Sequence, residues 1–198
     1  MITNSDYRRT IHRREAAGRQ TWRNGRRWRG FHKRSVIIGA WIVLALVGSA
    51  SEAGRPYRRG EWRHWVDADR DCLDTRHEVL VVESRTAPVL DQCRVVRGTW
   101  FDPYNGELII APQALDVDHM IPLRFAHEHG GAMWSRARKA AYANSLDDPD
   151  HLVAVSASLN RQKSDKGPDR WVPPRRASHF WYGRAWDRIV TTWRLQLQ

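Results

Sequence analysis

Two short stretches of the chain decide its fold: residues 116–123 read DVDHMIPL, and residues 160–168 read NRQKSDKGP. The first places a carboxylate beside an imidazole in an alternating segment that stops at Pro122, which suits the end of a strand. Residues 151–155 (HLVAV) are apolar and predict a short buried strand. Ser156 is a suitable cap for a helix that must end before Pro168, with Lys166 and Gly167 as its natural end. We therefore expect the order strand, long connection, strand, helix.

These residue types fit the cleavage of a phosphodiester bond. His119 is the side chain suited to take a proton from water near neutral pH. Asp118 and Asn160 offer oxygen ligands for a hard divalent cation, which stabilises charge on the phosphate. In a regular strand Asp118 and His119 face opposite sides, so only the tertiary fold can bring both to one phosphate. The candidate cations for binding backbone phosphates are Arg161, Lys163 and Arg124.

The two stretches resemble the corresponding segments of the HNH domain in CRISPR RNA-guided DNA nucleases, whose ββα-metal motif runs strand, long loop, strand, helix. The fuller pattern is similar to exported bacterial HNH endonucleases related to the C-terminal nuclease domain of GmrSD-type restriction enzymes, and it covers about residues 60–193. The residues that carry this likeness are Asp69-Arg70-Asp71-Cys72, Thr75-Arg76, Glu78-Val79-Leu80, Gly98-Thr99-Trp100, Asp102-Pro103-Tyr104, residues 116–123, Ala126-His127, Trp134, Ala143-Asn144, residues 152–155, Asn160-Arg161 and Trp171.

This resemblance implies an HNH endonuclease that hydrolyses DNA, with RNA left open as a second substrate. It implies that His119 is the general base and that Asp118 and Asn160 bind one divalent metal ion, usually Mg²⁺. The middle position of the motif, often Asn in relatives, is His151 here. Relatives use that residue to order the loop between the strands, and the role of His151 is left open. The expected fold class is α+β, with an HNH ββα-metal core.

An N-terminal hairpin region is expected before this core. Residues 75–84 (TRHEVLVVES) have a continuous apolar centre and suit either a strand or a helix. Residues 93–96 and 98–100 predict short strands. The sequence DPYNG at residues 102–106 is a strong turn signal, and residues 107–111 predict the second arm of a hairpin.

Helices are expected within and after the core. Residues 123–144 predict a helical region that is broken at Gly130 and Gly131. Residues 181–197 predict a C-terminal amphipathic helix, because apolar residues recur there at helical spacing. These apolar residues are Trp186, Ile189, Val190 and Trp193.

Charge and hydropathy separate a leader, residues 1–53, from the expected nuclease domain, residues 54–198. The chain carries 33 Lys and Arg against 22 Asp and Glu, a formal charge of +11, but residues 1–34 alone hold eleven basic and two acidic side chains. Residues 55–198 have 22 basic and 19 acidic residues, an excess of +3, so most of the positive charge lies outside the expected nuclease domain and the total of +11 is not evidence for DNA binding. Residues 35–51 have no charged side chain and suit a signal peptide or an uncleaved membrane anchor. We therefore expect a secreted protein, or one anchored with the nuclease domain outside the membrane.

Cys72 and Cys93 both follow the apolar segment, so an exported chain would carry them in an oxidising compartment. A disulfide is expected, with two free buried thiols as the alternative. Beside them, Asp67, Asp69 and Asp71 with Glu78 imitate the spacing of an EF-hand calcium loop, although Cys72 stands where that loop needs Gly. The alternative to an enzyme is therefore a non-catalytic exported or membrane-anchored module that binds calcium or nucleic acid.

Overall fold

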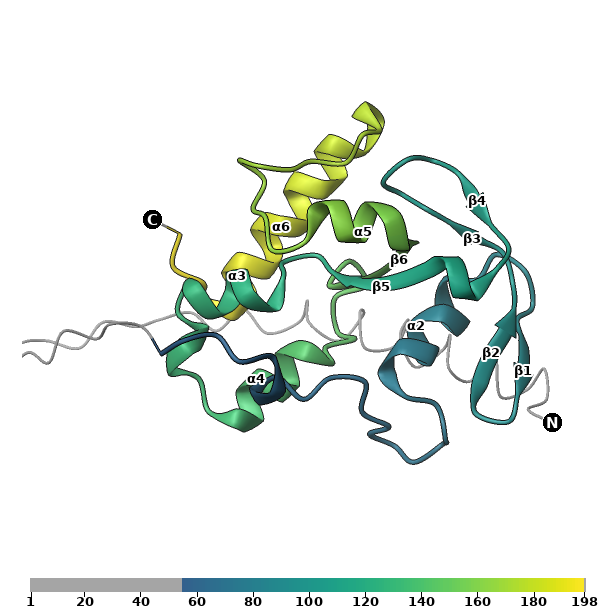
Figure 1. Cartoon of the computed structure of the whole chain (residues 1–198), viewed down its shortest axis with the longest axis horizontal. Helices are drawn as coiled ribbons and strands as arrows, with labels where there is room; N and C mark the ends of the chain where they lie inside the picture. The colour runs from purple at the N-terminus through teal and green to yellow at the C-terminus, as the bar shows by residue number, and fades with distance from the viewer. Residues whose placement is uncertain (1–54, 198) are drawn as a thin grey trace, which may run out of the picture.

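The computed structural model describes residues 55–197 as a mixed α+β fold, in which small antiparallel sheets are surrounded by helices (Figure 1). The expected α+β class is therefore confirmed. The leader and its apolar segment 35–51 lie outside the described residues, and the expected domain boundary stays a prediction. Within residues 55–197, no helix combines the length and apolar character that crossing a bilayer requires.

The central sheet is the antiparallel pair β5 (Leu115–His119) and β6 (Leu152–Ser156), with His119 opposite Leu152. Helix α5 (Ala157–Lys163) follows β6 directly and packs against both strands (Figure 1). These elements lie where the sequence predicts them, although α5 ends at Lys163, earlier than the glycine that was expected to end it.

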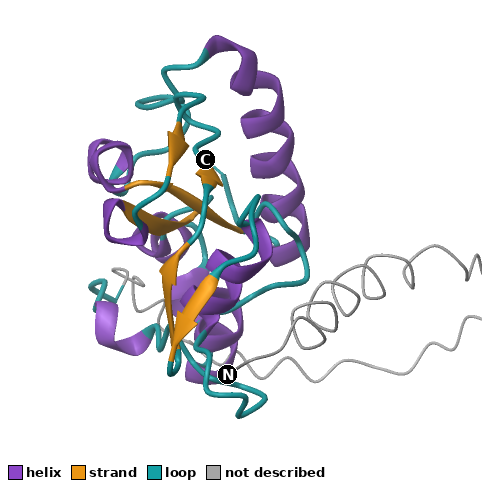
Figure 2. Ribbon diagram, turned by 90° about the vertical axis from the view of Figure 1, so that its right-hand side faces the viewer, coloured by secondary structure: helices purple, strands orange, loops and turns teal. Residues whose placement is uncertain are grey.

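Alternation along the two strands divides the apolar side chains between two cores, and helices lie on both sides of the strands (Figure 2). One face packs against α2 (Thr75–Glu83), and the other faces α5 and α6 (His179–Trp193). The core on the α2 side includes Leu115, Val117, Leu152 and Ala154 from the sheet. The core on the α5 side includes Val153 and Val155.

Residues 75–83 form a helix rather than a strand. Asp74 caps α2 by accepting a hydrogen bond from the backbone N–H of His77 at 2.9 Å. Val79 and Leu80 are fully buried against the sheet, and Trp100 donates its indole N–H to the carbonyl of Leu80 at 2.8 Å. Tertiary packing thus decides between two structures that the apolar run alone leaves open.

Two short hairpins form the N-terminal hairpin region at one end of the fold (Figure 1). Strands β1 (Val89–Asp91) and β2 (Arg94–Arg97) make the first, of which the sequence predicted only the second strand. Strands β3 (Trp100–Phe101) and β4 (Leu108–Ile109) make the second, across the predicted DPYNG turn. That turn needs a left-handed residue, and Gly106 supplies it with φ +87°.

The predicted disulfide between Cys72 and Cys93 is present, with Cα atoms 5.2 Å apart. It joins the loop before α2 to the turn between β1 and β2. The bridge therefore fastens the hairpin region to a helix of the α2-side core.

The long connection between β5 and β6 is helical and broken where predicted. It contains α3 (Leu123–Glu128) and α4 (Arg136–Ala143), with a short 3₁₀ turn, η4 (Gly131–Met133), between them. Gly130 has φ +108°, a conformation that ends α3 and that other residues rarely adopt. Ser135 caps α4 by accepting from the N–H of Arg138 at 3.2 Å.

The predicted C-terminal helix is α6, and three further 3₁₀ turns complete the described elements. Trp186 and Ile189 are buried, while Val190 and Trp193 are partly buried against the same core. The further turns are η2 (Arg59–Glu61), η3 (Pro112–Ala114) and η5 (Arg176–Ser178).

Side chains, not a third strand, satisfy the outer edges of the central sheet. On β6, the backbone N–H groups of Ala154 and Ser156 donate to the carboxylates of Glu83 and Asp102. On β5, the carbonyls of the first and last residues accept from Arg76 at 3.1 Å and Lys163 at 2.7 Å. Among residues 55–197, β5 therefore pairs with β6 alone, and its other edge is lined by cations.

Candidate functional site at strand β5

Asp118 and His119 lie on opposite faces of β5, as the alternation of a regular strand requires. Asp118 points toward α5, where Lys163 lies, and His119 points toward Trp65 and the end of α4. Asn160 lies on the α5 side, so it shares a face with Asp118 and not with His119. The structure thus groups the sequence-predicted residues into two neighbourhoods separated by the thickness of one strand.

Asp118 is held in a buried ion pair with Lys163. The ammonium donates to both carboxylate oxygens, at 2.9 and 2.7 Å, and to the carbonyl of His119 at 2.7 Å. The Tyr104 hydroxyl adds a fourth bond, to Asp118 at 2.6 Å. Lys163 is fully buried, so its expected contact with a substrate phosphate is corrected: its ammonium is enclosed by groups of β5.

Burial raises the pKa of the Asp118 carboxyl and lowers the pKa of the Lys163 ammonium, while their mutual attraction opposes both shifts. All three ammonium protons have an acceptor, which is the arrangement that a charged lysine requires. We therefore treat the pair as ionised at neutral pH. Because the pair is buried, removing one partner would leave an uncompensated charge in the core.

His119 presents a neutral ring with a fixed tautomer. Its Nε2 lies 2.9 Å from the carbonyl oxygen of Ala143, and a carbonyl can only accept, so Nε2 carries the proton. Nδ1 therefore keeps its lone pair. Burial lowers the pKa of His119 well below its ordinary value, and His151 and Lys163 lower it further. The Trp65 ring stacks on the imidazole with centroids 5.6 Å apart, and Trp65 has the left-handed φ of 59°.

His151 orders the long connection between the strands. Its Nε2 donates to the carbonyl of Tyr142 at 2.7 Å, one residue before the carbonyl that holds His119. Burial lowers the pKa of His151 to about 4, so this ring is also neutral at pH 7. Two histidines, one at the end of β5 and one directly before β6, thus hold the sheet against the last residues of α4.

Asn160 contacts a different carboxylate from the one expected. Its amide nitrogen donates to Asp116 at 3.0 Å, and both side chains are partly exposed. Asp116 lies two residues before Asp118, on the same face of β5. A carboxylate and an amide oxygen are the types of ligand that a hard divalent cation prefers, and here they come from two elements in contact. The oxygens of Asp118 fit one poorly, because the ammonium of Lys163 already bonds both of them.

The other expected phosphate contacts lie on the surface. Arg124 pairs with Glu128 at 2.9 Å and with Asp165 at 3.3 Å, so its charge is shared with two acids. Arg161 is exposed on α5 and enters none of the ion pairs of residues 55–197. Of the three expected cations, Arg161 therefore has the most freedom to meet a phosphate.

Sequence reasoning missed Asp116, Tyr104 and Trp65 as parts of this site. Asp116 was quoted within the first stretch, and its alternation with Asp118 was the available signal. Tyr104 was read as a turn residue and as part of the family likeness, and no local pattern links it to Asp118. Nothing in the sequence indicates that Trp65 stacks on His119, because the two are joined only by the tertiary fold.

The acidic loop expected to imitate a calcium site does gather its carboxylates. Oxygens of Asp67, Asp69 and Asp71 lie within 4.8 Å of one another, and all three residues are exposed. Asp67 accepts from the N–H groups of Arg70 and Cys72, at 2.7 and 3.1 Å. These bonds account for the shape of the loop, so calcium binding stays a prediction.

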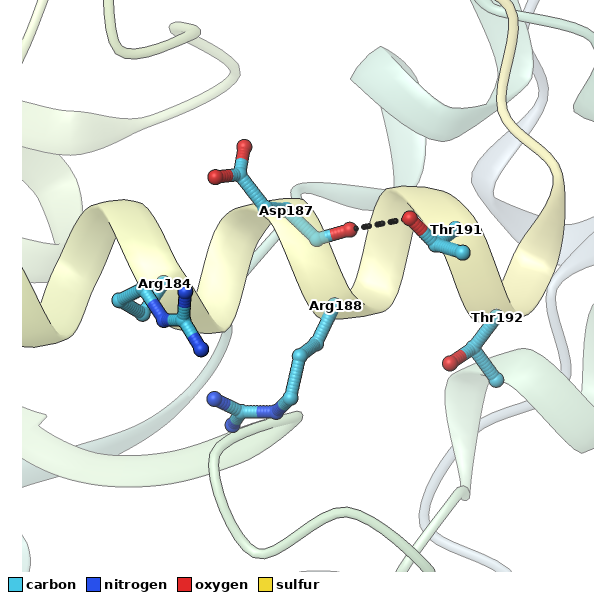
Figure 3. A pocket seen from close by; sticks show the side chains of 5 residues that line it. All are labelled: Arg184, Asp187, Arg188, Thr191 and Thr192. Carbon is cyan, nitrogen blue, oxygen red and sulfur yellow. Dashed lines mark hydrogen bonds between the residues drawn. The ribbon is translucent and has the colours of Figure 1, made fainter.

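A surface hollow lies on α6 (Figure 3). It is lined by Arg184, Asp187, Arg188, Thr191 and Thr192. Arg188 is turned toward the loop before β6, where it pairs with Asp148 and Asp150. The hollow contains no sequence-predicted site residue.

Comparison with known proteins gives a relative but no activity. The chain is 33% identical to an "Uncharacterized secreted protein" of Arthroderma benhamiae over 141 residues, which are 71% of this chain and 68% of the relative. No protein-family model and no solved structure matches the chain. The chain therefore belongs to the family of this secreted fungal protein. The expected membership of a bacterial HNH endonuclease family is wrong, because the relative is fungal and no such family model matches.

Proposed function

We propose that this member of a secreted fungal protein's family is an exported, metal-dependent endonuclease that hydrolyses phosphodiester bonds, in DNA more readily than in RNA. The observation that carries the proposal is the state of His119. A general base must be unprotonated and must offer a lone pair to water. The Ala143 carbonyl fixes the proton on Nε2, and the lowered pKa keeps the ring neutral at pH 7.

The strand pair and helix around His119 support the finer proposal of a ββα-metal core. We infer that Asn160 of α5 and a carboxylate of β5 hold one divalent cation, Mg²⁺ by preference. When bound, this ion would stabilise negative charge on the phosphate. Asp116 suits the carboxylate role better than the expected Asp118, because it already contacts Asn160 and does not bind Lys163.

We infer that one substrate spans the edge of β5 that, among residues 55–197, pairs with no other strand, and so meets groups from both faces. His119 lies on one face of β5, and Asp116 with Asn160 lies on the other. His119 takes a proton from water at Nδ1, while the Ala143 carbonyl holds the ring and stabilises the imidazolium that forms. Lys163 keeps the end of β5 in place through the carbonyl of His119.

Export is supported by two independent observations. The fungal relative is described as secreted. The Cys72–Cys93 disulfide is a bond that persists in oxidising compartments. We propose that the nuclease domain acts outside the cell, either free or anchored through residues 35–51.

The test is digestion of supercoiled plasmid by the purified chain, with Mg²⁺ and with EDTA in its place. Cleavage with Mg²⁺ and none with EDTA is expected. A protein that binds the plasmid without cutting it, under any divalent metal, would favour a non-catalytic nucleic-acid-binding module instead. Cleavage that persists in EDTA would contradict the metal requirement. An RNA transcript of the same sequence in parallel measures the preference between DNA and RNA.

A further inference from the structure

Three segments that are far apart in the sequence meet at Phe101 on β3. The guanidinium carbon of Arg85 lies 4.5 Å from the centre of the Phe101 ring, and that of Arg175 lies 5.4 Å from it. Both arginines are exposed, and the Phe101 ring that they contact is partly buried. Two cations are therefore gathered on one aromatic ring, which stabilises each of them there.

The backbone and side-chain contacts of Arg175 hold it in this position. Its N–H donates to the carbonyl of Tyr104 at 3.0 Å, and its Nη1 donates to the Ser178 hydroxyl at 3.4 Å. Its stem crosses Gly106 so closely that an added Cβ there would lie 3.0 Å from Cδ and Nε. Arg85 is fixed on its side by a bond from its N–H to the carbonyl of Thr99 at 2.7 Å.

Neither guanidinium enters an ion pair with any acid of residues 55–197, in contrast to Arg124 and Arg188. An aromatic ring contacts only the flat face of a guanidinium. The N–H groups around the edge of the guanidinium can therefore still donate hydrogen bonds. These planar, paired donors match the oxygens of a phosphate group. Two fixed, uncompensated guanidiniums thus suit a phosphodiester backbone, which offers anionic groups at a regular spacing.

This cluster is tied to the end of the central sheet opposite His119. Asp102, the next residue after Phe101, accepts from the N–H of Ser156 at 2.9 Å, and Ser156 pairs with the first residue of β5. His119 is the last residue of β5. At about 3.3 Å per residue, the two ends of the strand are roughly 13 Å apart. Phosphates of one strand rise about 3.4 Å each along a duplex, so this span covers about four of them.

We propose that Arg85, Phe101 and Arg175 form a clamp for the sugar–phosphate backbone of a nucleic acid strand whose scissile phosphate lies at His119. This inference rests on the proposed function and names its substrate class: a polymer several nucleotides long, not a small phosphodiester. The clamp binds without reading sequence, because its contacts are to phosphates.

The experiment compares the full chain with the double variant Arg85→Gln/Arg175→Gln. The matched control is Arg138→Gln/Arg184→Gln, which removes the same charge elsewhere; Arg138 also lies over an aromatic ring, that of Trp134, at 4.5 Å. Binding of a fluorescent 30-base-pair DNA is measured in EDTA at several salt concentrations. Cleavage is measured with Mg²⁺ on the same DNA and on bis(p-nitrophenyl) phosphate, a single phosphodiester.

For the clamp variant we expect the slope of log affinity against log salt to become shallower by about 2, one unit for each lost phosphate contact. KM for the DNA should rise roughly tenfold at low salt with kcat unchanged, and hydrolysis of the small phosphodiester should stay at the wild-type rate. The control double variant should change the salt slope by less than half as much.

An unchanged salt slope, or an equal change in the control, would overturn the clamp. So would an equal loss of activity on the small phosphodiester, because that loss would mean the variants disturb the reacting centre. If the wild-type chain neither binds nor cuts DNA, the proposed function fails and the clamp fails with it. The binding measurement in EDTA separates these cases, since it does not depend on catalysis.

Discussion

Asp118 and His119, adjacent residues on opposite faces of β5, differ in their charge states. On the α5 face, Asp118 is charged and bonded to Lys163 and Tyr104. On the α2 face, His119 is neutral, and burial lowers its pKa well below the ordinary value. Both side chains are almost fully buried. The difference lies in their surroundings: an ammonium keeps Asp118 ionised, whereas burial keeps His119 neutral and the Ala143 carbonyl fixes which nitrogen carries its proton.

This contrast indicates that the two adjacent residues of β5 have different roles. The Asp118–Lys163 pair satisfies its own charges, so it holds the strand and the helix together but has little capacity left for a ligand. His119 is held by one nitrogen only, which leaves the other for chemistry.

Replacing His119 with Ala should lower turnover by about 10²–10⁴-fold, because a general base contributes about that much. Extra Mg²⁺ should not restore the rate, since a cation cannot accept the proton. Added imidazole should restore part of it if the cavity admits the ring. The measurement is plasmid cleavage rate against Mg²⁺ concentration. His129→Ala is the control, because that ring stacks on Phe125 at the end of α3. Wild-type cleavage by His119→Ala would show that His119 is not the base.

Replacing Lys163 with Met should lower the free energy of unfolding by about 3–5 kcal/mol, because it leaves the Asp118 carboxylate buried and unpaired. Lys163→Met/Asp118→Asn removes both charges and should recover part of the loss. Urea denaturation at pH 7 measures each variant. Arg161→Met, a change to an exposed cation on the same helix, should stay within about 0.5 kcal/mol of wild type. A loss below 1 kcal/mol for Lys163→Met would contradict the buried pair.

His151 should make the protein less stable in acid. Its pKa is about 4 when folded and near 6.5 when unfolded, so between these values the unfolded chain binds more protons. Stability is therefore full above pH 6.5 and falls as pH drops toward 4. His151 should account for about 2–3 kcal/mol of the loss in the free energy of unfolding between pH 7.5 and pH 4.5. His151→Asn keeps a donor for the Tyr142 carbonyl and removes the titration. Denaturation at both pH values should show a smaller loss for this variant; an equal loss would refute the assignment.

The smallest expected effect is on metal affinity, and it distinguishes Asp116 from Asp118, the two carboxylates on the α5 face of β5. Asp116→Asn should weaken Mn²⁺ binding about tenfold, since it removes a charged oxygen ligand. Asp118→Asn should leave Mn²⁺ affinity within about twofold of wild type while lowering stability. Titration calorimetry with Mn²⁺ alone gives both affinities without any substrate. If Asp118→Asn weakens Mn²⁺ binding and Asp116→Asn does not, Asp118 is the metal ligand.

Local patterns predicted much of the fold but not the whole of it. The strand that precedes Pro122, the break at Gly130 and the turn at Gly106 could be read directly, because each depends on the backbone preferences of one or two residues. The α2 segment could not, because its apolar run suits a strand or a helix until the core selects one. The site followed the same rule: the residues at β5 were found, but not their partners.

The sequence by itself determined which chemical groups are available and their order along the chain: an imidazole beside a carboxylate, an amide and cations on the following helix, and two cysteines after an apolar segment. Only the tertiary structure decided which group faces which. Lys163 meets Asp118 across 45 residues, and the carbonyl that fixes His119 comes from 24 residues away. Periodicity reports which side of an element a residue occupies, whereas hydrogen-bond partners depend on how elements cross. That crossing is set by packing over the whole domain, and it turned an expected phosphate contact, Lys163, into a buried structural cation.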